Sequence, residues 1–238
     1  YDQNKLRLIL GYQKYYHVFN NGERVNTNQL EQIVPLQDNL QFLKIGRRIG
    51  HQIKIFQKLS ADFLRFIGLY IAEGHTEKKY LLVSIHEKAL QHKFIKDLES
   101  LNINFTERAF NPGDFQINNS LLAELFSAWC GSNSYNKHLP PWFLQLTKTQ
   151  LALIISAYFS GDGNEAKNEV AAATASKRLA RDLSYALLLF GIQTRIRSIW
   201  KSATNSRMRS KKLYYELIIS GQKDIRIFER EIGFVLER

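Results

Sequence analysis

The chain has 238 residues, 45% of them hydrophobic, and a formal net charge of +11 from 33 lysine and arginine residues against 22 acidic ones. This length can bury a hydrophobic core as one large domain or two small ones, and the positive charge points to an anionic partner. The single cysteine, Cys130, excludes an intramolecular disulfide and cysteine-pair metal sites, and no run of about 18 apolar residues predicts a membrane span.

The positive charge is concentrated toward the two ends of the chain. Residues 1–60 carry a net charge of +5, residues 61–175 a net charge of −2, and residues 176–238 a net charge of +8. The first region includes Arg47 and Arg48, which are candidates for contact with the anionic partner.

Residues 60–146 are predicted to begin with a helix. Ser60 stands before its first residue, Ala61, as a cap, and Gly74 ends it. The elements expected after it are a β-rich run at Lys79–His86, a helix at Lys88–Leu101, and strands at Ile103–Ala109 and Phe115–Asn118.

Residues 147–238 repeat this order at an offset of 89 residues. Thr147 and Gln150 form a predicted capping box, and Gly163 matches Gly74. The later elements are a β-rich run at Asn168–Thr174, a helix at Lys177–Phe190, and strands at Gln193–Lys201 and Lys212–Ile219. We therefore predict an α+β protein built from one duplicated unit with pseudo-twofold symmetry.

The first helix of each half carries small residues four positions apart. These are Gly68 and Ala72 in the first half, and Ala157 and Gly161 in the second. Spacing of four places each pair on one face, where two helix backbones can approach closely. Ordinary core packing would also explain small residues at this spacing.

An acidic residue stands at the end of both helices. Glu73 and Asp162 occupy the last helical position, where the helix dipole disfavours a carboxylate. If the helices pack through their small faces, the two acids meet at the same end. Two neighbouring anions need a cation, and a divalent metal is the natural candidate.

Basic residues alternate along the strand Gln193–Lys201. One face presents Arg195, Arg197 and Lys201, and the opposite face, with Trp200, is expected to be partly buried. A basic loop leads to the next strand and contains Arg207, Arg209, Lys211 and Lys212. This arrangement is typical of a nucleic-acid groove, although solvated surface is the ordinary alternative.

The segments FIGLYIAEG (66–74) and ISAYFSGDG (155–163) resemble the signature helices of a LAGLIDADG homing endonuclease of the single-chain, two-motif type. The stretch GSNSYNKHLPPWF (131–143) is similar to the one before the second motif in intein-encoded members. Glu73 replaces the commoner Asp. The chain has neither the first Cys or Ser nor the final His-Asn of an intact intein, so we do not expect it to splice.

The resemblance implies a monomer with two halves, residues 60–146 and 147–238, each of α-β-β-α-β-β-α order. The two motif helices would pack against each other, and the antiparallel sheets would form a saddle-shaped DNA-binding surface. The resemblance implies an intracellular enzyme, in cytoplasm, nucleoid or an organelle, that makes a magnesium-dependent double-strand break in DNA at a long site. Residues 1–59 would extend the DNA-binding surface or belong to an intein scaffold, and the sequence leaves both open.

The resemblance also assigns roles at the site. Glu73 and Asp162 would bind Mg²⁺ with the backbone carbonyls of Ala72 and Gly161, while Lys137 and either Lys212 or Lys211 would act as catalytic lysines. Mn²⁺ is expected to replace Mg²⁺, and Ca²⁺ to support binding without cleavage. The expected DNA contacts are His75, Asn164, Arg108, Arg195, Arg197, Lys201, Arg207, Arg209, Lys211, Arg47 and Arg48.

The alternative function is a catalytically inactive nucleic-acid binder on the same fold, either an intron maturase or a transcription regulator. The pair of acids discriminates between the two, because a binder gains nothing from carboxylates placed against phosphate. Both acids are present, which favours cleavage.

Overall fold

The structure, a computed structural model, describes residues 42–45, 51–54, 59–166, 168–202 and 211–236. The chain divides into two compact units, Tyr1–Lys58 and Leu59–Arg238. In the first unit, strands β1 (Phe42–Ile45) and β2 (His51–Lys54) pair antiparallel. Among the described residues, no helix has the length and apolar character needed to cross a membrane.

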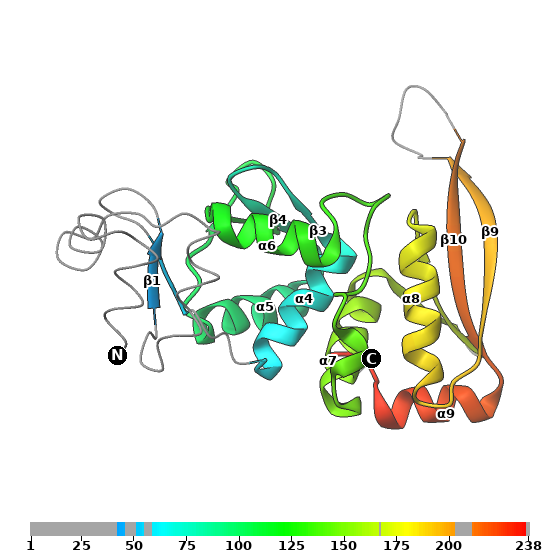
Figure 1. Cartoon of the computed structure of the whole chain (residues 1–238). Helices are drawn as coiled ribbons and strands as arrows, with labels where there is room; N and C mark the ends of the chain where they lie inside the picture. Colours follow the sequence, from blue (N-terminus) through cyan, green and yellow to red (C-terminus); the bar gives the residue numbers. More distant parts are fainter. Residues whose placement is uncertain (1–41, 46–50, 55–58, 167, 203–210, 237–238) are drawn as a thin grey trace, which may run out of the picture. The chain divides into compact units, whose positions relative to one another are not determined.

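The second unit contains two copies of the predicted α-β-β-α-β-β-α order (Figure 1). The first copy comprises α4 (Ala61–Glu73), β3 (Gly74–Thr76), β4 (Leu81–Ser84), α5 (Lys88–Ser100), β5 (Thr106–Glu107), β6 (Asp114–Ile117) and α6 (Ser120–Cys130). The second comprises α7 (Lys148–Asp162), β7 (Gly163–Ala166), β8 (Glu169–Thr174), α8 (Lys177–Leu188), β9 (Thr194–Ser202), β10 (Lys211–Ser220) and α9 (Gln222–Glu231). A short 3-10 helix, Phe143–Gln145, lies between the copies.

Each copy forms a four-stranded antiparallel sheet with the same topology. The strand orders are β3-β4-β6-β5 and β7-β8-β10-β9. Glu107 pairs with Phe115 in the first sheet, and Ile196 pairs with Leu217 at the equivalent place in the second. The offset is therefore 89 from Glu107 to Ile196 but 102 from Phe115 to Leu217, so the last hairpin is 13 residues longer in the second half.

The strand predicted at Ile103–Ala109 is wrong in extent, since β5 covers only Thr106–Glu107. The Ile103 amide donates to Leu98 O at 2.9 Å and closes the end of α5, while Asn102 has a left-handed backbone with φ of 55°. Because that amide is already used by the helix end, Ile103 does not contribute to the strand ladder.

Both motif helices begin and end where the sequence predicts. The Ser60 side chain accepts from the Phe63 amide, and Thr147 and Gln150 form the capping box. The helices end before Gly74 and Gly163, whose φ values of −102° and −83° are not left-handed. Glycine is needed there for space instead, because a Cβ on Gly163 would lie 2.2 Å from the Phe159 carbonyl oxygen.

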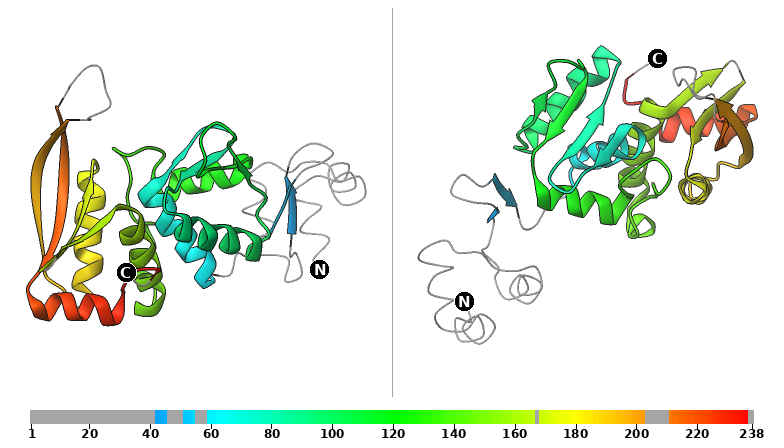
Figure 2. Two further views of the ribbon diagram at one scale, coloured as in Figure 1. Left: turned by 180° about the vertical axis from the view of Figure 1, so that it is seen from behind. Right: turned by 90° about the horizontal axis from the view of Figure 1, so that it is seen from above.

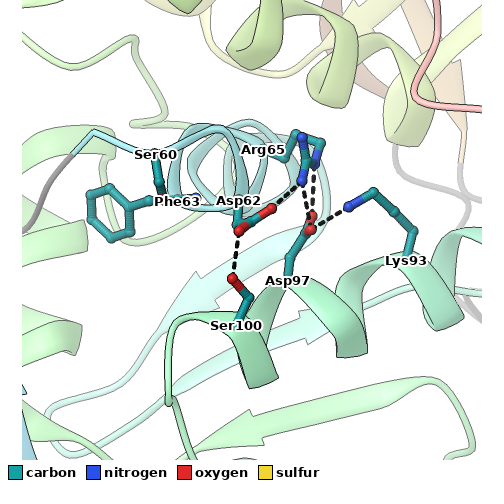
Figure 3. A network of polar contacts seen from close by, with 7 residues as sticks. All are labelled: Ser60, Asp62, Phe63, Arg65, Lys93, Asp97 and Ser100. Carbon is teal, nitrogen blue, oxygen red and sulfur yellow. Dashed lines mark hydrogen bonds and ion pairs between the residues drawn. The ribbon is translucent and has the colours of Figure 1, made fainter.

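A polar network joins α4 to α5 in the first half (Figure 3). Asp97, which is 1% exposed, accepts from Arg65 Nε at 2.8 Å and Arg65 Nη2 at 2.7 Å, and also pairs with Lys93. Arg65 in turn pairs with Asp62, which accepts from Ser100. A buried carboxylate held by two cations stabilises this contact only while both signs of charge are present.

The second half lacks this network. The positions equivalent to Arg65 and Asp97 hold Ile154 and Ala186, both fully buried. Among the described residues, this polar network is therefore specific to the first half, although the two halves share their topology.

The β9–β10 hairpin extends past the end of α8 in both ribbon views (Figures 1 and 2). Near the base, Thr194 Oγ1 lies 2.7 Å from Ser184 Oγ of α8. Farther along the same face, Ile196 is 37% exposed and Trp200 is 67% exposed. The prediction that this face is partly buried is wrong at Trp200, because the overhanging part of the hairpin is not covered by α8.

Candidate active site

Helices α4 and α7 pack through the small residues picked out by the sequence. A Cβ added to Gly68 would lie 2.3 Å from the Ile154 carbonyl oxygen and 2.7 Å from Ala157 Cβ. One added to Gly161 would lie 2.7 Å from Ala72 Cβ. The backbones therefore approach more closely than any larger side chains would allow.

This close packing brings the two acids to the same end of the helix pair. Glu73 is the last residue of α4 and Asp162 is the last residue of α7. An added Cβ on Gly161, directly before Asp162, would lie 3.1 Å from Glu73 Cγ and 3.7 Å from Glu73 Oε1. Both acids are half-buried, and burial raises the pKa of the Glu73 carboxyl.

Lys137 is buried beside the first motif helix. Its side chain is 2% exposed, and Nζ donates to Tyr70 O at 2.7 Å and lies 3.3 Å from the centroid of the Tyr70 ring. Burial lowers the pKa of Lys137 to about 7, against the opposing effects of Cys130 and Asp162. An amine with this pKa can hold or release a proton near neutral pH.

The other predicted lysines lie on β10. Lys211 and Lys212 are exposed, and Lys212 Nζ lies 5.7 Å from the Tyr135 ring centroid. A hydrogen bond to Tyr135 raises the pKa of Lys212. Lys212 pairs with Lys201 in the part of the hairpin that is longer in the second half, so it has no equivalent residue in the first half.

Two predicted contacts lie two residues after the acids, beyond Gly74 and Gly163. His75 on β3 is half-buried, and burial lowers the pKa of its imidazole. Asn164 on β7 is exposed and takes the equivalent position in the second half. Strands β3 and β7 begin directly after Glu73 and Asp162, so His75 and Asn164 are each two residues from an acid along the chain.

The predicted strand arginines are accessible. Arg195 and Arg197 are exposed on β9, where Arg197 pairs with Glu216, and the strand register makes Arg108 the counterpart of Arg197. Arg108 donates to Gln116 Oε1 at 2.9 and 3.0 Å. The backbone of Lys201 pairs with Lys212. Four further predicted contacts lie outside the described residues: Arg47, Arg48, Arg207 and Arg209.

Comparison with known proteins identifies this arrangement. Residues 149–233 match the family model of the LAGLIDADG-like domain. A structure of mesophilic variants of the homing endonuclease I-DmoI aligns with a TM-score of 0.52 and 13% identity, over 74% of this chain and 97% of that one. The chain has the LAGLIDADG fold. Full-length DUF199/WhiA from Thermatoga maritima aligns with a TM-score of 0.52 and 15% identity, over 75% of this chain and 57% of that one.

Curated relatives share a segment of similar length. The replication factor C small subunit of Methanocaldococcus jannaschii is 28% identical over 207 residues, which are 82% of this chain and 11% of that protein. The RNA polymerase subunit Rpo1C of the same organism is 30% identical over 201 residues, 80% of this chain and 23% of that protein. The chain thus spans about a tenth to a quarter of the length of these relatives.

The LAGLIDADG helix ends offer a donor set that fits a divalent cation. Among the described residues, no group of three or more His, Cys, Asp or Glu side chains forms a metal cage. Magnesium is commonly held by only one or two carboxylates together with substrate phosphates. Glu73 and Asp162 supply two carboxylates, and Ala72 and Gly161 beside them supply backbone carbonyl oxygens. These are the oxygen ligands that Mg²⁺ prefers.

Two tyrosines of the motif helices were not singled out from the sequence. Tyr70 presents its carbonyl and ring to Lys137, and its hydroxyl donates to Gly131 O at 2.7 Å. Tyr158 is fully buried four residues before Asp162. Only the position of Tyr158 one turn before an acid could have drawn attention to it in the sequence.

Proposed function

We propose that the chain is a site-specific DNA endonuclease that makes a metal-dependent double-strand break, as a homing endonuclease does. The observation that carries the proposal is the meeting of Glu73 and Asp162 at the touching ends of α4 and α7. Each acid would serve one DNA strand. The internal repeat relates the two acids by pseudo-twofold symmetry. The two phosphates cleaved on antiparallel DNA strands are also related by a twofold axis, so each acid can face one of them.

The chemistry follows from the side chains at this end of the helix pair. Glu73 and Asp162 would hold Mg²⁺, which would supply a Lewis acid for the phosphate and lower the pKa of the attacking water. Lys137, with a pKa near 7, can accept a proton from that water as an amine or offset phosphate charge as an ammonium. Arg195 and Arg197 would bind DNA phosphates and bases along β9.

Divalent cations and DNA are supported by the solved neighbours. A single-substitution variant of I-DmoI has been determined with its target DNA in the presence of Mg, and I-DmoI itself with DNA and Ca, both at TM-scores of 0.50. These are properties of I-DmoI, and the shared fold makes them reasonable for this chain. Because both acids come from one chain, we propose a monomer as the active form.

The curated relatives support an origin as a mobile insertion of the intein type. Their names belong to unrelated processes, including replication, transcription and, for a probable initiation factor IF-2, translation. Each nevertheless shares a stretch of about the length of this chain. A segment inserted independently into different host proteins would produce this distribution.

The decisive experiment combines the chain, Mg²⁺ and DNA carrying the uninterrupted form of the gene that encodes it. We expect a double-strand break with the wild-type chain. Asp162→Asn should lose cleavage of at least one strand while its DNA binding in Ca²⁺ stays within about threefold of wild type, because only the cation-binding charge is removed. Glu124→Gln, an exposed acid on α6, is the matched control and should cleave normally.

The outcomes separate the two candidate functions. Tight binding of this DNA without any break would contradict the proposal and favour the inactive binder. Normal cleavage of both strands by Asp162→Asn would leave the endonuclease standing but refute the assignment of this acid.

A further inference from the structure

Tyr158 has a buried hydroxyl without a protein partner. Among the described residues, its oxygen is the only buried side-chain nitrogen or oxygen without a hydrogen-bond partner, and its side chain has 0% exposure. An unpaired buried hydroxyl costs about 1–3 kcal/mol, so such groups are rare and call for a cause.

The surroundings of Tyr158 point to the acid pair. Asp162 follows Tyr158 by four residues on α7, so the two positions share a helix face. Burial raises the pKa of the Tyr158 hydroxyl well above its usual value, and the charges of Asp162 and Glu73 raise it further. A phenol hydroxyl can donate a hydrogen bond to a carboxylate, and within the described residues the Tyr158 hydroxyl has not used this donor.

Resting on the proposed endonuclease function, we infer that Tyr158 is a positioning residue of the Glu73–Asp162 site. Its hydroxyl donates a hydrogen bond to a carboxylate of this pair when the pair is arranged to hold a divalent cation. A donor of this kind fixes the orientation of a ligating carboxylate and leaves its remaining oxygen lone pairs for the metal. The equivalent position in the first half is the apolar Leu69, so the acid pair is served from one helix only.

The test is Mn²⁺ binding by the chain alone, measured from the electron paramagnetic resonance signal of free Mn²⁺, with wild type and Tyr158→Phe. We expect the dissociation constant to rise about tenfold in Tyr158→Phe, the range found for loss of a hydrogen-bond partner of a metal ligand. Asp162→Asn should abolish this binding. Tyr185→Phe is the matched control, since Tyr185 is 62% exposed on α8, and should bind Mn²⁺ as wild type does.

Thermal unfolding without metal separates this role from ordinary core packing. Tyr158→Phe should melt at the wild-type temperature or slightly above it, because the lost hydroxyl has no partner to lose. Tyr70→Phe should melt lower, because the Tyr70 hydroxyl donates to Gly131 O.

The results distinguish this inference from the function on which it rests. If wild type binds Mn²⁺, Asp162→Asn does not, and Tyr158→Phe stays within twofold of wild type, only the role of Tyr158 is refuted. If wild type itself binds no Mn²⁺, the inference about Tyr158 fails. If wild type also cleaves no DNA, the proposed function fails with it.

Discussion

Replacing Gly68 by alanine should open the α4–α7 contact. The new Cβ would lie 2.3 Å from the Ile154 carbonyl oxygen, whereas ordinary contacts begin near 3.4 Å. Ile154 O belongs to the backbone of α7, so no flexible side chain can move aside, and the helices must separate locally by about 1 Å.

The expected loss can be estimated from two opposing terms. Crowding a packed interior costs about 1–3 kcal/mol, and contact with backbone places this case at the upper end. The better helix propensity of alanine returns about 1 kcal/mol. The free energy of unfolding should therefore fall by about 2 kcal/mol. A displacement of about 1 Å at the acids should also reduce cleavage by about 100-fold.

Urea unfolding followed by circular dichroism measures the first effect, and the cleavage assay measures the second. Gly191→Ala is the control, since Gly191 has open space around it but a φ of 81°, so alanine should cost about 1 kcal/mol without affecting cleavage. An unfolding free energy of Gly68→Ala equal to or above that of wild type would refute the packing argument. Equal cleavage losses in both variants would show that general destabilisation is responsible.

Two further predictions concern buried charge. Because the pKa of Lys137 is about 7 in the folded chain and about 10.5 when unfolded, the unfolded state binds more protons between these pH values. The free energy of unfolding of wild type, relative to that of Lys137→Met, should therefore rise with pH across this window by up to about 1.4 kcal/mol per pH unit. Urea unfolding from pH 6 to 11 measures this difference. A difference that stays constant over this range would contradict the burial of Lys137. Asp97→Ala should lower the unfolding free energy by about 3 kcal/mol, because the mostly buried Arg65 loses its bidentate partner and keeps only the pair with Asp62. Arg65→Met combined with Asp97→Ala should lose less. Equal losses in urea unfolding would exclude the weakened charge compensation of Arg65 as the cause.

Local chemistry made much of this architecture predictable. Ser60 and the Thr147–Gln150 pair mark helix starts through hydrogen bonds made within three residues, and Gly74 and Gly163 mark the ends because a side chain would strike the preceding turn. Short-range features of this kind are contained in the sequence itself.

The contacts of Lys137 and Lys212 depend on distant parts of the chain. The sequence gives both residues the same charge, but the fold buries Lys137 against Tyr70, 67 residues away, and leaves Lys212 exposed beside Tyr135. Burial of this kind is decided by tertiary packing, which also explains why the unpaired hydroxyl of Tyr158 could not be foreseen.

The longer β9–β10 hairpin has a consequence for how evenly a target would be read. The ten-residue strand β10 spans about 34 Å, close to the length of ten base pairs, whereas its four-residue counterpart β6 spans about 13 Å. Under the proposed function, one flank of the target carries more of the information that distinguishes it from the genome. Base changes in the flank read by the first half would therefore still allow cleavage. Base changes in the flank read by the second half would make the host gene resistant to cleavage.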